Sequence, residues 1–134
     1  MIRLARVMVL IFLLASQASA SNLDLAWRKV IFVESSNGQN KKAYTPNSCG
    51  ACGIAQIRPI MVKDINRILR VKAFVHSDTL DDAASKEMFR VYQEHYNKGA
   101  SVEKMCRSWY AGPGKRLQAS KQTDEYWKMC LNSK

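Results

Sequence analysis

Residues 22–36 read Asn-Leu-Asp-Leu-Ala-Trp-Arg-Lys-Val-Ile-Phe-Val-Glu-Ser-Ser, and this stretch decides the fold class. Its apolar side chains recur every three or four positions, which is the spacing of one face of an α-helix. Asn22 or Asp24 is suited to cap the helix start, and Glu34 shares the apolar face with Trp27. We therefore expect a helix that ends near Glu34 and directs its carboxyl group toward the interior.

Further helical segments with the same spacing follow along the chain, each marked by a residue that favours a helix start or end. Proline suits a first helical turn, Ser and Thr cap helix starts, and glycine suits a left-handed end. No run of alternating apolar residues is present, so the fold is expected to be mainly α, with room for a small β element in the loop over residues 37–52. The expected segments are Pro59 to about Arg70, Asp81 or Asp82 to just before a cap at Gly99, Ser101 to Ala111, and a short last helix capped by Thr123.

The first twenty residues have the pattern of a cleaved secretion signal. Arg3 and Arg6 give a positive start, an apolar stretch follows over residues 7–15, and small residues stand at Ala18 and Ala20. The apolar stretch is far shorter than the ~20 residues that a membrane-spanning helix needs. We expect residues 1–20 to be a signal peptide, so that the protein, residues 21–134, is secreted or periplasmic and not stably inserted in a membrane.

Export changes what the four cysteines indicate. In an oxidising compartment, an even number of cysteines predicts disulfides, and the pairing favoured here is Cys49 with Cys52 and Cys106 with Cys130. Two other pairings are equally allowed by the count. Cys49-Gly-Ala-Cys52 also has the spacing of a redox motif, but the β–α–β context of that motif is missing. A zinc site is disfavoured because the last two cysteines are not closely spaced.

The charge of the chain points to a polyanionic partner outside the cell. The formal charge is +10, and removal of residues 1–20 leaves 19 basic and 11 acidic residues, a charge of +8. An exported protein with this charge is expected to meet the cell envelope and not nucleic acid. Nothing in the sequence indicates an obligate oligomer, so we expect a monomer of one domain.

Glu34 is the residue from which the sequence predicts chemistry. A turn-forming Ser-Ser-Asn-Gly stretch over residues 35–38 follows it and would open a cleft beside the carboxyl group. A carboxyl group in a partly apolar pocket has a raised pKa, which lets it hold a proton near neutral pH and act as a general acid. Periodicity alone favours the alternative that Glu34 points into water, and the motifs around it shift the balance toward the pocket.

At this point the sequence resembles a known family. Val33-Glu34-Ser35-Ser36, then Gly53-Ile54-Ala55-Gln56-Ile57, Trp109-Tyr110-Ala111-Gly112 and Tyr126 follow one another in the order of the motifs of the lytic transglycosylase catalytic domain. That family is glycoside hydrolase family 23, which includes soluble bacterial transglycosylases and goose-type lysozymes. Each motif alone is weak, whereas their common order is specific and covers nearly all of residues 21–134.

The resemblance implies a single lysozyme-like domain with a groove for peptidoglycan glycan strands, and a lytic transglycosylase that needs neither cofactor nor metal. Glu34 would be the catalytic acid and then the base, and the muramyl 6-hydroxyl would close a 1,6-anhydro ring on the cleaved sugar. Such chemistry dispenses with the second carboxylate of most glycosidases. The substrate-binding residues implied are Ser35, Gln56, Tyr110 and Tyr126, and Ser35 would orient either Glu34 or the substrate.

Two departures from the family pattern bear on the groove. Ala55 stands where the family has Met, which predicts a wider wall, and Tyr110 stands where it has Asn. Trp109 is expected in the core, with a sugar-stacking role as the alternative.

Two other functions remain open from the sequence. A hydrolytic lysozyme on the same fold would need a carboxylate such as Asp64, Asp78 or Asp81 across the groove from Glu34 to position water. A non-catalytic module that binds the wall or inhibits a lytic enzyme would need only the positive charge.

Overall fold

The computed structural model describes residues 21–134, so the predicted signal peptide lies outside the described residues. The described chain is mainly α, as the periodicity predicts, and contains no strand. No helix within it is long and apolar enough to cross a membrane.

The first described helix covers residues 21–35 and packs one face into the core. Ala26 and Val30 are fully buried on that face, with Trp27 beside them. The helix ends because two consecutive residues, Ser36 and Asn37, adopt left-handed backbone conformations with φ of 52° and 58°. Their amides bond back to carbonyls of the last helical turns, so the chain turns sharply after Glu34.

Residues 36–58 form the loop that closes one side of the site. A short 3-10 helix, η1 (Lys41–Tyr44), lies in it. The β element allowed for residues 37–52 is absent, because pairing is limited to one isolated bridge between Cys52 and Ile57. That bridge closes a tight turn at Gly53, whose amide bonds to the carbonyl of Ala43 and whose φ is +86°. Such a compact turn leaves no extended segment for a ladder.

Helices α2 (Pro59–Leu69) and α3 (Asp82–Tyr96) begin where the sequence predicts. Pro59 stands at the first turn of α2, and the Asp81 side chain caps α3 by accepting from the amide of Ala84. The cap predicted at Gly99 is wrong: α3 ends at Tyr96 with Asn97 as its C-cap, and Gly99 takes its positive φ in the turn beyond. The 3-10 helix η2 (His76–Leu80) between α2 and α3 was not predicted.

The last three helices are α4 (Val102–Ala111), α5 (Lys115–Gln118) and α6 (Lys121–Leu131). Ser101 caps α4 as predicted. The cap predicted at Thr123 for the last helix is wrong, because Ser120 accepts the capping bond from the Thr123 amide. The Thr123 hydroxyl instead bonds back to the carbonyl of Leu117, which ties the short α5 to α6.

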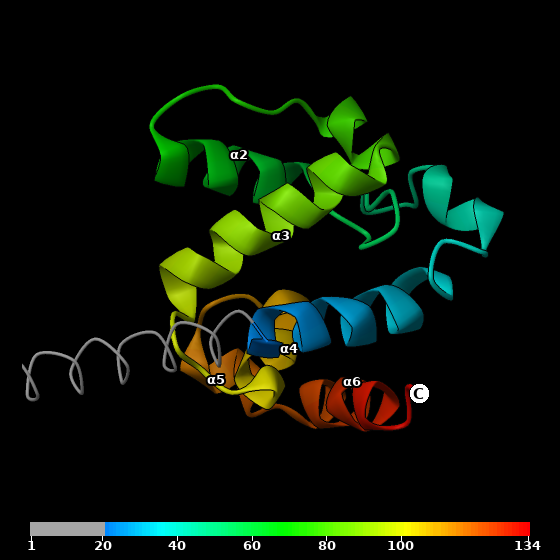
Figure 1. Cartoon of the computed structure of the whole chain (residues 1–134), viewed down its shortest axis with the longest axis vertical. Coiled ribbons are helices and arrows are strands. Elements are labelled where there is room, and N and C mark those ends of the chain that lie inside the picture. The colour runs from blue at the N-terminus through cyan, green and yellow to red at the C-terminus, as the bar shows by residue number, and fades with distance from the viewer. Residues whose placement is uncertain (1–20) are drawn as a thin grey trace, which may run out of the picture.

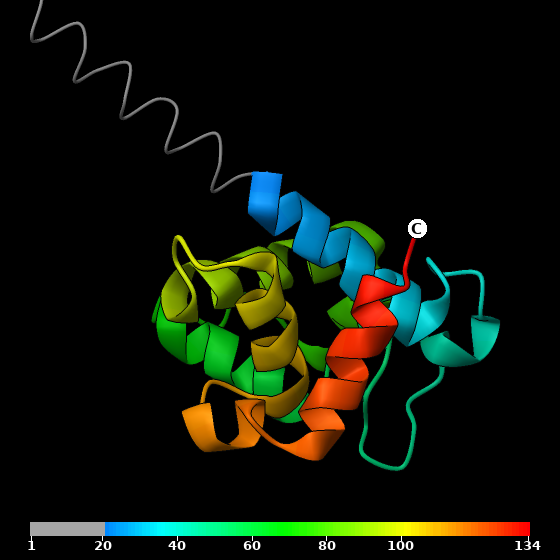
Figure 2. The same ribbon diagram turned by 90° about the horizontal axis from the view of Figure 1, so that it is seen from below.

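Helix α3 crosses the middle of the molecule (Figure 1), with α2 on one side and helix 21–35, α4 and α6 on the other. Seen from below, α6 lies beside the end of helix 21–35 that carries Glu34 (Figure 2). Aromatic rings join these layers: the ring centroid of Phe89 in α3 lies 5.3 Å from that of Trp27 and 4.9 Å from that of Trp109. The packing of α4 and α6 against helix 21–35 brings residues about 90 positions apart into one site.

Candidate functional site

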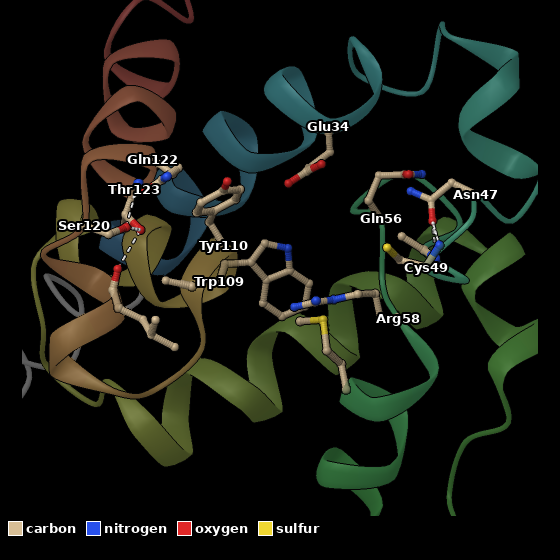
Figure 3. Close-up of a pocket in the computed structure, with 14 residues that line it drawn as sticks. Glu34, Asn47, Cys49, Gln56, Arg58, Trp109, Tyr110, Ser120, Gln122 and Thr123 are labelled. Carbon is tan, nitrogen blue, oxygen red and sulfur yellow. Dashed lines mark hydrogen bonds between the residues drawn. The ribbon is translucent and has the colours of Figure 1, made fainter.

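A pocket of about 490 Å³ opens beside Glu34. This volume falls within the ~300–1,000 Å³ typical of sites for small molecules. Figure 3 shows its residues converging from helix 21–35, the 36–58 loop, the start of α2, α4 and the start of α6. The lining residues are Glu34, Asn47, Cys49, Ala51, Gln56, Arg58, Met61, Trp109, Tyr110, Ala111, Leu117, Ser120, Gln122 and Thr123.

Glu34 enters the pocket from the last turn of helix 21–35 and does not point into open water, the alternative that periodicity alone favoured. Burial raises the pKa of its carboxyl group from 4.5 to about 7, because the ionised form loses hydration. The Tyr126 hydroxyl, which donates to Oε1 at 3.0 Å, and the nearby charge of Arg58 both oppose that rise. A carboxyl group with this pKa exchanges a proton readily near neutral pH.

Tyr126 holds Glu34 from behind the pocket. It is 2% exposed and does not line the pocket, and its hydroxyl is committed to Glu34. The structure therefore gives Tyr126 a positioning contact with the acid in place of the direct substrate contact that was expected. Burial also raises the pKa of Tyr126 well above its usual range, so the phenol stays a donor.

Tyr110 lies where the pocket opens. It is 42% exposed, and its ring stacks on that of Tyr126 with centroids 4.6 Å apart and planes 16° from parallel. This contact explains how the chain accommodates a tyrosine where the resemblance expects Asn: the ring covers Tyr126 and leaves its outer face to the pocket. Tyr110 therefore lines the pocket, and its contact with a substrate stays a prediction.

Ser35 does not lie where a substrate would reach it. It is 1% exposed, and its hydroxyl donates to the carbonyls of Ile31 and Ile54 and accepts from the Gly38 amide. With these partners the hydroxyl ties the helix end to the Gly53 turn. The expected substrate contact of Ser35 is thus replaced by a structural one that fixes the backbone next to Glu34.

Gln56 does line the pocket, on the wall opposite Tyr110 (Figure 3). Its Nε2 donates to the carbonyls of Ala43 and Gly53, both at 2.9 Å, and its backbone is left-handed with φ of 53°. These two bonds fix the amide, so its oxygen is the atom offered to a ligand.

Two expectations about the wall are changed by packing. Ala55 is fully buried, so the prediction that it widens the groove wall is wrong: its small side chain faces the core. Its carbonyl accepts from Nε1 of Trp109 at 3.1 Å. Trp109 is 3% exposed and packs edge-on against Phe89 and Tyr92, which confirms its place in the core, although its edge forms part of the pocket floor.

Among the described residues, Glu34 is the one acidic side chain that lines the pocket. Asp64 accepts from the Tyr96 hydroxyl at 2.6 Å and pairs with Arg67 at 2.8 Å. Asp78 and Asp81 accept from backbone amides at the starts of η2 and α3. The carboxylates that a water-positioning role would need are therefore engaged elsewhere.

All four cysteines are free thiols in the structure. Cys106 of α4 and Cys130 of α6 face each other, and the hydrogen bond to Cys130, with burial, raises the pKa of the Cys106 thiol. No disulfide joins Cys106 to Cys130 or Cys49 to Cys52 in the described chain, so both predicted bonds stay predictions. Cys49 is exposed at the pocket and Cys52 is buried in the Gly53 turn, and neither begins a helix as a redox motif would.

No group of three or more His, Cys, Asp or Glu side chains within residues 21–134 is arranged to hold a metal ion. The polar groups that line the pocket are one carboxyl group, one guanidinium, the thiol of Cys49, and several amides and hydroxyls. Such a set can transfer a proton and bind polar ligands.

Sequence reasoning missed several polar pocket residues, among them Arg58 and Asn47. The signal for Arg58 was available: it directly precedes Pro59, and a residue before proline is held in an extended conformation, here φ −83° and ψ 155°. Asn47 sits in an irregular loop, where its Oδ1 accepts from the amides of Cys49 and Ala51. No periodicity predicts such a position.

No protein-family model, curated protein or solved structure matches the chain. The function must therefore be argued from the geometry of the pocket and from the motif resemblance.

Proposed function

We propose that the protein is a secreted lytic transglycosylase with a lysozyme-like fold, which cleaves the β-1,4 bond between N-acetylmuramic acid and N-acetylglucosamine. The observation that carries this proposal is the carboxyl group of Glu34. It lines an open pocket, its pKa is raised to about 7, and it accepts a hydrogen bond from the Tyr126 hydroxyl. A general acid works best when its pKa is close to the working pH. Glu34 meets that condition.

In the proposed reaction, Glu34 gives its proton to the glycosidic oxygen as the bond from that oxygen to the muramyl anomeric carbon breaks. The resulting carboxylate then takes the proton of the muramyl 6-hydroxyl, and that oxygen bonds to the anomeric carbon. The products are a 1,6-anhydromuramyl end and a sugar with a free 4-hydroxyl. Proton and bond counts balance without water, so one carboxyl group is sufficient.

The surroundings of Glu34 support this choice over hydrolysis. A hydrolase that inverts or retains configuration uses a second carboxylate near the first, within about 5–10 Å. Among the described residues the pocket has none, and Asp64, Asp78 and Asp81 are bound to other partners. A ligand hydroxyl that serves as the nucleophile removes the need for one.

The test is mass spectrometry of the soluble products that the purified protein releases from peptidoglycan. We expect anhydromuramyl products from the unaltered protein and none from Glu34→Gln, which keeps the shape and the Tyr126 contact but has no proton to give. Glu125→Gln is the matched control, because it removes an exposed carboxyl group from α6 outside the pocket lining and should leave the products unchanged.

Reducing-end products would replace the proposal with a hydrolase. Equal product release by Glu34→Gln would refute the role of the acid. Binding to peptidoglycan with no product from the unaltered protein would favour the non-catalytic module.

A further inference from the structure

Arg58 is the single cationic side chain among the described residues that line the pocket. Proline at position 59 holds the Arg58 backbone extended, and Figure 3 shows the side chain reaching into the pocket from the start of α2, across from Glu34. The charge of Arg58 also acts on Glu34, because it lowers the pKa of that carboxyl group. Arg58, although exposed, therefore places a positive charge on the wall of the pocket.

The charge of Arg58 is not neutralised by the described part of the chain. Arg67, Arg90 and Arg107 each pair with carboxylates, whereas Arg58 takes part in no ion pair or side-chain hydrogen bond there. Glu34 cannot neutralise Arg58 fully either, since a pKa of about 7 leaves much of that carboxyl protonated near neutral pH. The guanidinium thus keeps its fork of donors for a ligand.

A guanidinium fork is suited to a carboxylate, which it binds through two parallel hydrogen bonds. Under the proposed function, on which this inference rests, the ligand has carboxylates in one region. The 3-O-lactyl branch of muramic acid ends in a free carboxylate on bare strands, or continues into a stem peptide that bears carboxylates. N-acetylglucosamine has none.

We propose that Arg58 binds a carboxylate on the lactyl branch of muramic acid, and that this contact selects muramyl sugars at the pocket. The same chemistry serves the lactyl carboxylate itself and a carboxylate of the stem peptide. Recognition of this branch would set the register of the strand, so that the bond presented to Glu34 is one made by a muramyl anomeric carbon.

The experiment measures binding in the Glu34→Gln background by isothermal titration calorimetry, so that the ligand is not consumed. Four probes are used: strands with stem peptides, strands stripped of peptides by an amidase, and a form of each of these two whose carboxylates have been converted to carboxamides. Arg58→Met is compared with Arg58→Lys and with Arg28→Met, which removes an exposed charge from helix 21–35 outside the pocket lining.

We expect Arg58→Met to weaken binding of carboxylate-bearing strands by roughly tenfold, the loss of one charge-assisted contact in a solvated site. The amidated strands should bind Arg58→Met and its parent equally. Arg58→Lys should fall between, because it keeps the charge without the fork. A loss confined to stripped strands identifies the lactyl carboxylate as the ligand, and a loss confined to peptide-bearing strands identifies the stem.

Equal weakening for amidated strands, or the same loss in Arg28→Met, would overturn the inference, because bulk charge would then explain the effect. Unchanged binding in Arg58→Met would overturn it as well. The product assay keeps the two proposals apart. Anhydromuramyl products with no Arg58 effect refute this inference alone, whereas an Arg58 effect without products refutes the enzyme and leaves carboxylate binding in place.

Discussion

The raised pKa of Glu34 predicts that this carboxyl group destabilises the fold in neutral and alkaline solution. In the folded protein its pKa is about 7, whereas in the unfolded chain it returns to about 4.5. Between these values the unfolded chain releases a proton that the folded protein retains. The stability that depends on this carboxyl group is therefore present below pH 4.5 and is lost as the pH rises through 7.

The size of the effect follows from the same two values. One pKa unit corresponds to about 1.4 kcal/mol, so the rise from 4.5 to about 7 amounts to at most about 3 kcal/mol. Glu34→Gln replaces the carboxyl group by a neutral group of the same shape, which can still accept from Tyr126. We expect this variant to match the parent below pH 4.5 and to exceed it by about 2–3 kcal/mol above pH 7.

The assay is urea unfolding followed by circular dichroism at a series of pH values from 4 to 8, with the difference between variant and parent as the result. Glu125→Gln is the control, because its exposed side chain is hydrated in both states and should give a flat difference. If the difference in unfolding free energy between Glu34→Gln and the parent is also independent of pH, the burial argument is refuted, and with it the proposed protonation of Glu34.

Three other perturbations test contacts around the site. Tyr126→Phe removes the hydrogen bond that lowers the pKa of Glu34, so the alkaline limb of the pH–activity profile should move up by about one unit; an unmoved or lowered limb would contradict this. Gly53→Ala would place a Cβ 2.0 Å from the Thr79 carbonyl oxygen at a φ of +86°, and thermal melting should show a loss of several kcal/mol, about 3 or more; a melt like that of the parent would count against the turn geometry. Mild oxidation should join Cys106 to Cys130 and raise the melting temperature, and peptide mapping that links either thiol to Cys49 instead would refute the pairing.

Much of the fold could be predicted because it depends on local rules. Helix 21–35, α2 and α4 follow from apolar spacing combined with a proline or a capping side chain. The short α5 and η2 were missed because each has too few residues for a periodic pattern to be read. The caps at Thr123 and Gly99 were misplaced because neighbouring residues compete for the same role, and tertiary contacts decide between them.

The site was predicted less evenly, for the same physical reason. The position of Glu34 at the end of an apolar face is a local property that the sequence shows, whereas periodicity alone favoured water for its side chain and the motif context was needed to place it in a pocket. The contact between Glu34 and Tyr126 joins residues 92 positions apart, and only the packing of α6 on helix 21–35 creates it. Ser35 was assigned to substrate because the motif names the residue and not its orientation, which the carbonyls of Ile31 and Ile54 determine.

The two neighbours of Glu34 oppose the rise in pKa that burial causes. This opposition is useful if the carboxyl group acts first as an acid and then as a base. A carboxyl group that was only buried would hold its proton too firmly to leave a useful base after cleavage. Tyr126 and Arg58 favour the ionised form, so they bring the pKa back toward neutrality, where both forms are accessible. A ligand carboxylate on Arg58 would cancel part of that charge and raise the pKa of Glu34. Binding of the proposed muramyl branch would thus keep Glu34 protonated at the moment when an acid is needed. Release of that branch would return the pKa of Glu34 to its value in the empty site.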